Sequence, residues 1–206
     1  MDCLEFVGLS NIVISLSAAG ATCIAGWGLK SWKDQKIWEI DHELARRVLM
    51  NLYLYSDAIK NVRHPFILTE EMSAPLESKG KMKIEHIPFL RSKMLYENRL
   101  KNLHNVRTNI YVDLNEATAI WGPTIAEKFK PLFRLQTHLE SHIRMYSSSI
   151  DPDIPDDKRE KYHELLDGRP DILSYFPEEG NTFTSQFISA MENLEEDLRS
   201  RLGRRV

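Results

Sequence analysis

Residues 43–66, ELARRVLMNLYLYSDAIKNVRHPF, decide the fold that we predict for this chain. Apolar residues recur in this stretch at alternating spacings of three and four, the stripe that an α-helix buries in a bundle or coiled coil. The stripe consists of Ala45, Val48, Leu52, Tyr55, Ile59 and Val62. The helix is expected to begin near Ile37 and to stop before Pro65, because a residue that precedes proline is pushed out of the helical region.

Three later segments repeat this pattern. The first should form a helix of roughly 30 residues that ends at Gly122 and Pro123. Its apolar face is predicted to hold Phe89, Tyr96, Leu100, Leu103, Val106, Ile110, Leu114, Ala117 and Ile120. The second presents Ile125, Phe129, Leu132, Leu139, Ile143 and Tyr146, and the last presents Phe187, Met191, Leu194 and Leu198. The predicted fold is therefore all-α, an antiparallel bundle of about four amphipathic helices.

A different kind of segment precedes the bundle. Residues 7–29 read VGLSNIVISLSAAGATCIAGWGL and carry no charge. About 20 such residues cross the roughly 30 Å of hydrocarbon in a bilayer, so the stretch is predicted to be a transmembrane helix. Its serines, Asn11 and glycines lower its hydrophobicity, and an interfacial or protein-buried helix is the alternative.

The charges beside this segment predict its orientation. No Lys or Arg precedes it, whereas three lysines follow at once, and basic residues favour the cytoplasmic side. Tryptophan favours the headgroup region. The predicted membrane-interface residues are Trp27, Lys30, Trp32, Lys33 and Lys36. We expect single-pass insertion in a bacterial inner membrane, with the N-terminus outside and the C-terminal domain cytoplasmic.

The predicted organisation has three parts. Residues 1–6 form a short non-cytoplasmic tail, residues 7–29 the transmembrane helix, and residues 30–206 the cytoplasmic helical bundle, with loops at about 64–88 and 149–181. The last helix ends in Arg199, Arg201, Arg204 and Arg205. These arginines would reach anionic lipid if that helix ended next to the membrane.

Composition excludes some classes of function. The formal net charge is -3 and the pI is near 6.2, which provides no basic footprint for nucleic acid, so no nucleic-acid partner is expected. The two cysteines, Cys3 and Cys23, both lie in or before the apolar segment. The remaining chain can form no internal disulfide and no thiolate zinc site.

Small residues recur every four positions in the apolar segment and allow close helix packing in lipid. The candidate helix-association residues are Ala18, Ala21, Thr22, Ala25 and Gly26. They suggest a homo-oligomer or a pairing with another membrane protein. The general abundance of Ala, Ser and Gly in membrane helices explains the pattern equally well.

Catalytic and metal-binding patterns are sparse. Glu39 and His42 form one Glu-x-x-His pair, and His138 and His142 lie four apart on a helix, so a metal centre in the bundle is an alternative. The plainer interpretation is a solvated first turn and the flank of a core stripe, and no cofactor is expected. Arg99 and Asp113 lie near the apolar face of one helix and are predicted to form a buried polar contact.

The run from Glu43 to Phe66, after an apolar helix and a Trp/Lys-rich joint, resembles uncharacterised bacterial single-pass membrane proteins with a helical cytoplasmic domain. The resemblance implies a bacterial inner membrane and brings no activity. The function expected is a membrane-anchored, non-enzymatic interaction or scaffold subunit with membrane lipid and a protein as partners. A metal-dependent helical-bundle enzyme and an oligomerising membrane effector are the alternatives.

Overall fold

The computed structural model describes residues 3–64, 86–173 and 182–203, and it describes side chains from Gly26 onward. These residues form five helices and no strand: α1 (Cys3–Val62), α2 (Ile87–Trp121), α3 (Thr124–Ser149), α4 (Asp156–Asp167) and α5 (Thr182–Gly203). The predicted all-α class is confirmed over this part of the chain.

Helix α1 is longer than the sequence pattern indicated. A separate bundle helix was expected to begin near Ile37, but one uninterrupted helix runs from Cys3 to Val62. The reason is that the chain contains no proline before Pro65 to break it. The helix ends before Pro65 as predicted, in a turn where the His64 N–H donates to the Asn61 carbonyl at 3.1 Å.

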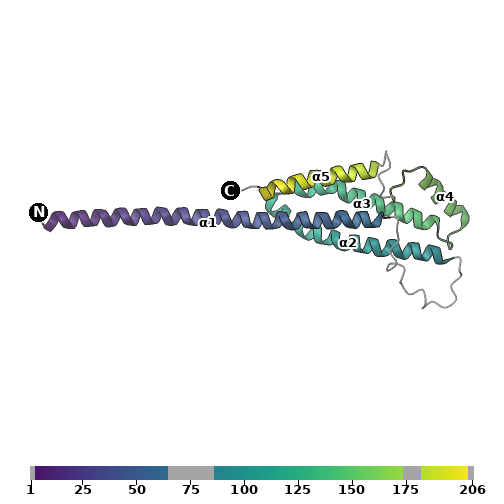
Figure 1. Ribbon diagram of the computed structural model, residues 1–206, viewed down its shortest axis with the longest axis horizontal. Helices are drawn as coiled ribbons and strands as arrows, with labels where there is room; N and C mark the ends of the chain where they lie inside the picture. Colours follow the sequence, from purple (N-terminus) through teal and green to yellow (C-terminus); the bar gives the residue numbers. More distant parts are fainter. Residues whose placement is uncertain (1–2, 65–85, 174–181, 204–206) are drawn as a thin grey trace, which may run out of the picture.

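Four of the helices form an antiparallel bundle (Figure 1). Helix α1 packs against α2 and α5, and α3 packs against the same two helices from the opposite side. Because α1 and α3 run away from the N-terminal end while α2 and α5 return toward it, each helix has antiparallel neighbours. Helix α4 packs on α3 at the far end of the bundle.

The N-terminal part of α1 extends beyond the bundle (Figure 1). Residues 26–40, which we call the stalk, contain no buried side chain, and burial begins at Leu44 and Ala45. The α2–α3 turn and the end of α5 lie at the stalk end of the bundle. The bundle was predicted to begin at residue 30. In the structure, buried side chains begin several helical turns later, at Leu44.

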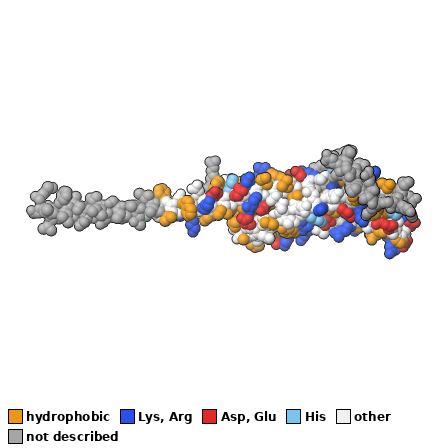
Figure 2. Space-filling view, turned by 90° about the horizontal axis from the view of Figure 1, so that it is seen from below, with side chains coloured by type: hydrophobic (Ala, Val, Ile, Leu, Met, Phe, Trp, Pro, Cys, Tyr) orange, Lys and Arg blue, Asp and Glu red, His pale blue; other side chains and the backbone are white. Residues whose placement is uncertain are grey.

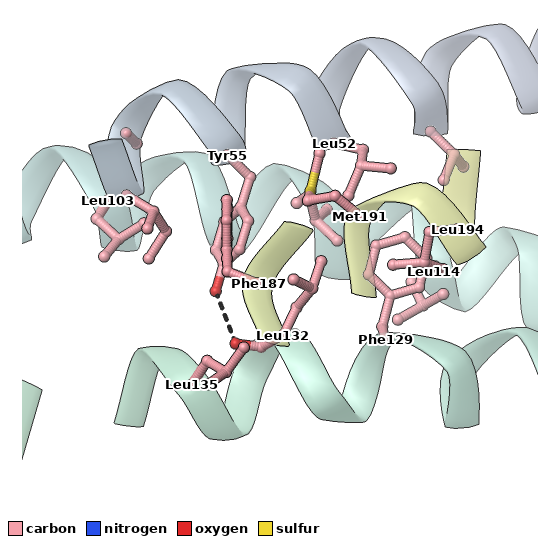
Figure 3. Packing of buried hydrophobic residues seen from close by; sticks show 14 of the residues in the cluster. Leu52, Tyr55, Leu103, Leu114, Phe129, Leu132, Leu135, Phe187, Met191 and Leu194 are labelled. Atoms are coloured by element: carbon pink, nitrogen blue, oxygen red, sulfur yellow. Dashed lines mark hydrogen bonds between the residues drawn. The ribbon is translucent and has the colours of Figure 1, made fainter. Parts of the chain in front are cut away.

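The core consists mainly of the residues that the apolar stripes predicted. All six stripe residues of α1 are at most 1% exposed. Figure 3 shows residues of α1, α2, α3 and α5 meeting between the helices, among them Leu52, Leu103, Phe129 and Leu194. Burying each large apolar side chain contributes about 1.5–3 kcal/mol, so this layer supplies most of the stability.

Ile120 is the exception, since its side chain is 48% exposed although it was assigned to the core face of α2. Ala117 keeps the seven-residue repeat of Leu103 and Ile110 at 0% exposure, so the repeat itself holds to the end of α2. Ile120 lies one residue before the end of the helix at Trp121, where the α2–α3 turn begins.

Local sequence explains where α2 ends and where α4 begins. Gly122 adopts φ 87°, a left-handed conformation that glycine tolerates, and its N–H bonds the Thr118 carbonyl at 3.0 Å. Helix α4 lies within residues 149–181, which were assigned to a loop, and it begins at Asp156, after Pro155. Two aspartates in its first turn favour that start, because negative charge stabilises a helix N-terminus.

Among the described residues, no helix is long and apolar enough to cross a membrane. Most of the predicted span, residues 7–25, precedes the first described side chain. The described part of the chain therefore gives no support to a transmembrane segment. Most of the predicted loop at 64–88 also lies outside the described residues.

Candidate functional site

The stalk exposes large apolar side chains on opposite sides of one helix. Trp27, Leu29 and Trp32 are 78%, 68% and 64% exposed. At about 100° of rotation per residue, Trp27 points away from Leu29 and Trp32. Figure 2 shows apolar and basic side chains side by side where the stalk begins. A helix that pairs with one partner helix has one apolar face, whereas this segment is apolar on several.

The three predicted interface lysines also lie on the stalk surface. Lys36 pairs with Glu39 at 2.8 Å, three residues along the helix, and both side chains are more than half exposed. Such a pair contributes little to stability. Within the described part of the chain, Lys30 and Lys33 form no ion pair. Two of the three cations therefore face solvent without an ion pair among the described residues, although Asp34 lies four residues after Lys30.

The stalk is joined to the bundle by aromatic and polar contacts at the α2–α3 turn. The Trp121 indole N–H donates to the Asp41 carboxylate. The Arg201 guanidinium lies 4.3 Å from the centroid of the same indole, and Trp38 stacks on His42 at 4.9 Å. The Trp121–Asp41 contact joins α1 to the end of α2, whereas the Trp38–His42 stack lies within α1.

The arginines at the end of α5 are engaged within the bundle. Arg199 donates to Glu195 at 2.8 Å and to the Tyr53 hydroxyl at 3.0 Å. Arg201 lies 3.5 Å from Asp197. The two later arginines of the tail lie outside the described residues. The basic end of α5 therefore helps to hold α5 on α1 and on the α2–α3 turn.

The four metal-ligand candidates do not converge. His42 follows Asp41, which accepts the Trp121 hydrogen bond at the end of α2. His138 and His142 lie 14 and 18 residues into α3 from Thr124, which places them about 20 Å or more along the bundle. Glu39 is paired with Lys36. Among the described residues, no three His, Cys, Asp or Glu side chains are close enough to hold a metal ion.

The helix-association candidates lie at the start of α1. The side chains of Ala18, Ala21, Thr22 and Ala25 are outside the described residues. Gly26 is described, and a Cβ placed on it would meet nothing within 4 Å. Close packing of a second helix at Gly26 therefore stays a prediction.

Asp113 and Arg99 are both buried, at 6% and 4% exposure, but the predicted contact between them is wrong. They are 14 residues apart on α2, about 21 Å along the axis. Asp113 instead accepts hydrogen bonds from Arg47 at 3.1 Å and from Asn51 at 2.6 Å, which tie α1 to α2. Arg99 donates to the His64 carbonyl at 2.7 Å.

A second buried arginine holds another connection. Arg63, 1% exposed, donates to the Ile172 carbonyl at 2.7 Å and to the Thr184 hydroxyl at 3.0 Å. Its guanidinium also lies 4.5 Å from the centroid of the Phe183 ring. Sequence periodicity did not identify Arg63, because it follows the last apolar residue of α1 and its partners lie more than 100 residues away.

A chain of polar side chains runs from the core to the surface between α1, α2 and α3. The buried Tyr55 hydroxyl donates to Gln136 at 2.8 Å, and Gln136 donates to Glu140 at 2.6 Å. His104 meets the same carboxylate at 2.9 Å. Burial raises the pKa of Tyr55 well above its ordinary value, so its hydroxyl stays protonated as a donor.

A groove of about 1200 Å³ runs between α3 and α5 on the outside of the bundle. Helix α3 contributes mainly long side chains, including Lys128, Arg134 and His138. Helix α5 contributes mostly small or polar ones, among them Ser185 and Ser189. The spacing of His138 predicted a place beside the core stripe. No sequence pattern indicated the groove, because the groove depends on how two helices lie together.

Comparison with protein-family models, with characterised proteins and with solved structures finds no significant match. Function is therefore inferred from the residues of the chain itself.

Proposed function

We propose that this protein is a membrane-anchored, non-enzymatic interaction subunit whose helical bundle faces the cytoplasm. The observation that carries the proposal is the stalk, where Trp27, Leu29 and Trp32 are exposed on opposite sides of a helix that leads away from the bundle. Such side chains lose stabilisation of roughly 1.5–3 kcal/mol each when they stay in water. A membrane interface would remove the exposed apolar side chains on all sides of the helix from water at once.

The lysines support the same placement. Lys30 and Lys33 follow the uncharged segment directly and face solvent. Near an anionic surface, each basic residue contributes about 1 kcal/mol. The uncharged residues before the stalk would form the span, and the lysines would lie on the cytoplasmic side.

The stalk would set the bundle apart from the bilayer. From Lys30 to Asp41, where the Trp121 contact joins α1 to the bundle, is 11 residues, or about 16 Å of helix. The bundle would then present its sides, rather than only its distal end, to other proteins. This geometry suits a subunit that holds a partner near the membrane.

Membrane fractionation tests the anchor. The full chain, expressed in a bacterium, should sediment with membranes, resist extraction by alkaline carbonate and dissolve in mild detergent. Replacing both stalk tryptophans, as Trp27→Ser with Trp32→Ser, should weaken membrane retention. Ile188→Ser, at a residue of α5 that is 48% exposed, is the matched control and should not. Recovery of the unaltered chain in the carbonate supernatant would overturn the proposal.

Cysteine labelling tests the orientation. In a chain with Cys3 and Cys23 replaced by serine, the single cysteine of Asp2→Cys should react with an impermeant maleimide on intact spheroplasts. The cysteine of His163→Cys, at an exposed residue of α4, should react only after lysis. The reverse pattern would contradict a cytoplasmic bundle. Purification in mild detergent from cells with native expression would then identify the protein that is bound.

A further inference from the structure

The α3–α5 groove has the length and shape that accept one more helix. Its α5 side extends from Ser185 to Ser200, 15 residues or about 22 Å of helix. Ser189 and Ala190 are too small to fill the space between the two helices. Leu135, 8% exposed, forms part of the floor. Small side chains let a further helix backbone approach closely.

The two sides of the groove differ in charge. Lys128, Arg134 and His138 lie on the α3 side, and Glu196 and Asp197 lie on the α5 side. Lys128 and Asp197 form a 2.6 Å ion pair, which shows that these two residues lie at the same height along the bundle. Arg134 and Glu196 are exposed and form no ion pair within the described part of the chain.

We infer that the groove is the interface of a parallel homodimer, in which α5 of each copy lies in the α3–α5 groove of the other. A two-fold axis along the bundle keeps every residue at its own height and brings the basic α3 side of one copy against the acidic α5 side of the other. Glu196 of the second copy then lies between the heights of Lys128 and Arg134. By symmetry, the contacts of Glu196 with Lys128 and with Arg134 of the other copy each occur twice in the dimer.

The charges also select this arrangement over the antiparallel one. An antiparallel two-fold would place α3 against α3 and bring Arg134 toward the basic residues of the second copy. Like charges at an interface disfavour association. The parallel arrangement also directs both stalks the same way, as insertion in one bilayer requires. This last point alone rests on the proposed function.

Charge reversal with mixing tests the interface. The full chain in mild detergent should be a dimer by light scattering. Arg134→Glu and Glu196→Arg should each raise the dissociation constant on the order of 10- to 100-fold. A mixture of the two variants should dimerise again. In the mixed dimer the introduced glutamate of one chain meets the introduced arginine of the other, and the unaltered Arg134 meets the unaltered Glu196.

Matched controls separate this effect from misfolding and from association through the membrane segment. Arg91→Glu and Glu97→Arg make the same charge changes at exposed residues of α2, outside the groove lining, and should leave the dimer intact. Circular dichroism checks that every variant keeps its helices. A monomeric parent chain, single variants that dimerise normally, or a mixture that stays monomeric would each overturn the homodimer.

Crosslinking provides a second readout. In the chain without native cysteines, Ser189→Cys should form a disulfide-linked dimer on mild oxidation, because the two α5 helices meet at the axis. Ile188→Cys, which lies outside the groove, should not. Equal crosslinking of both, or a different protein bound in the groove, would contradict the inference. A dimer that fails to sediment with membranes would refute the anchor and leave the interface standing.

Discussion

Removing the hydroxyl of Tyr55 should destabilise the bundle measurably. Tyr55 and Gln136 are both 0% exposed, and the hydroxyl donates to the Gln136 side-chain oxygen at 2.8 Å. It also lies 3.4 Å from the Leu132 carbonyl, the contact drawn in Figure 3. Tyr55→Phe keeps the ring but leaves the Gln136 oxygen without this donor, in a place that water does not reach.

The expected magnitude follows from that burial. A buried acceptor left without a partner costs about 1–3 kcal/mol of unfolding free energy. For a chain of this size each kcal/mol shifts the melting temperature by about 2–4 °C, so Tm should fall by roughly 2–12 °C. Tyr53→Phe is the control, because its hydroxyl bonds Glu195 at 2.7 Å on the exposed surface. Its effect should stay below about 1 kcal/mol.

The assay is thermal and urea unfolding of the full chain in mild detergent, followed by circular dichroism at 222 nm. Tyr55→Phe combined with Gln136→Leu should cost less than the sum of the two single changes, because the orphaned acceptor is removed together with its donor. If Tyr55→Phe were no less stable than Tyr53→Phe, the Tyr55–Gln136 hydrogen bond would not contribute as the burial implies.

Further predictions concern pH, packing and one turn. Burial lowers the pKa of His142, against a raising effect of Asp171. As pH falls below about 6.5, the unfolded chain therefore binds a proton before the folded chain does. The free energy of unfolding should decrease from that pH down to the folded pKa. His142→Gln should flatten this pH dependence in urea titrations between pH 7 and pH 5. Leu194→Ala, at 0% exposure, should cost about 2–5 kcal/mol, whereas Leu165→Ala, at 49% exposure, should stay within about 0.5 kcal/mol in the same unfolding assay. Gly122→Ala should cost about 1–2 kcal/mol, because φ 87° is strained for any residue with a Cβ; an unchanged melting temperature would show that the turn relaxes.

Periodicity identified most of the core because a helix in a bundle buries one stripe of its own sequence. All six stripe residues of α1 are buried, and Leu103, Phe129 and Leu198 are 0% exposed. The end of α1 before Pro65 and the break at Gly122 also follow from local backbone chemistry. Ile120 departs from the pattern at the last turn of α2, although Ala117 still keeps the seven-residue repeat there.

The sequence by itself determined the helical class, the core stripes and the apolar, lysine-flanked start of α1, because spacing along one helix fixes which side chains share a face. Only the tertiary structure decided that Asp113 bonds Arg47 and Asn51 rather than Arg99, and that Arg63 reaches Ile172. Only the tertiary structure also placed Arg134 and Glu196 on one groove. These contacts join residues tens of positions apart, and their partners are set by how the helices lie against one another.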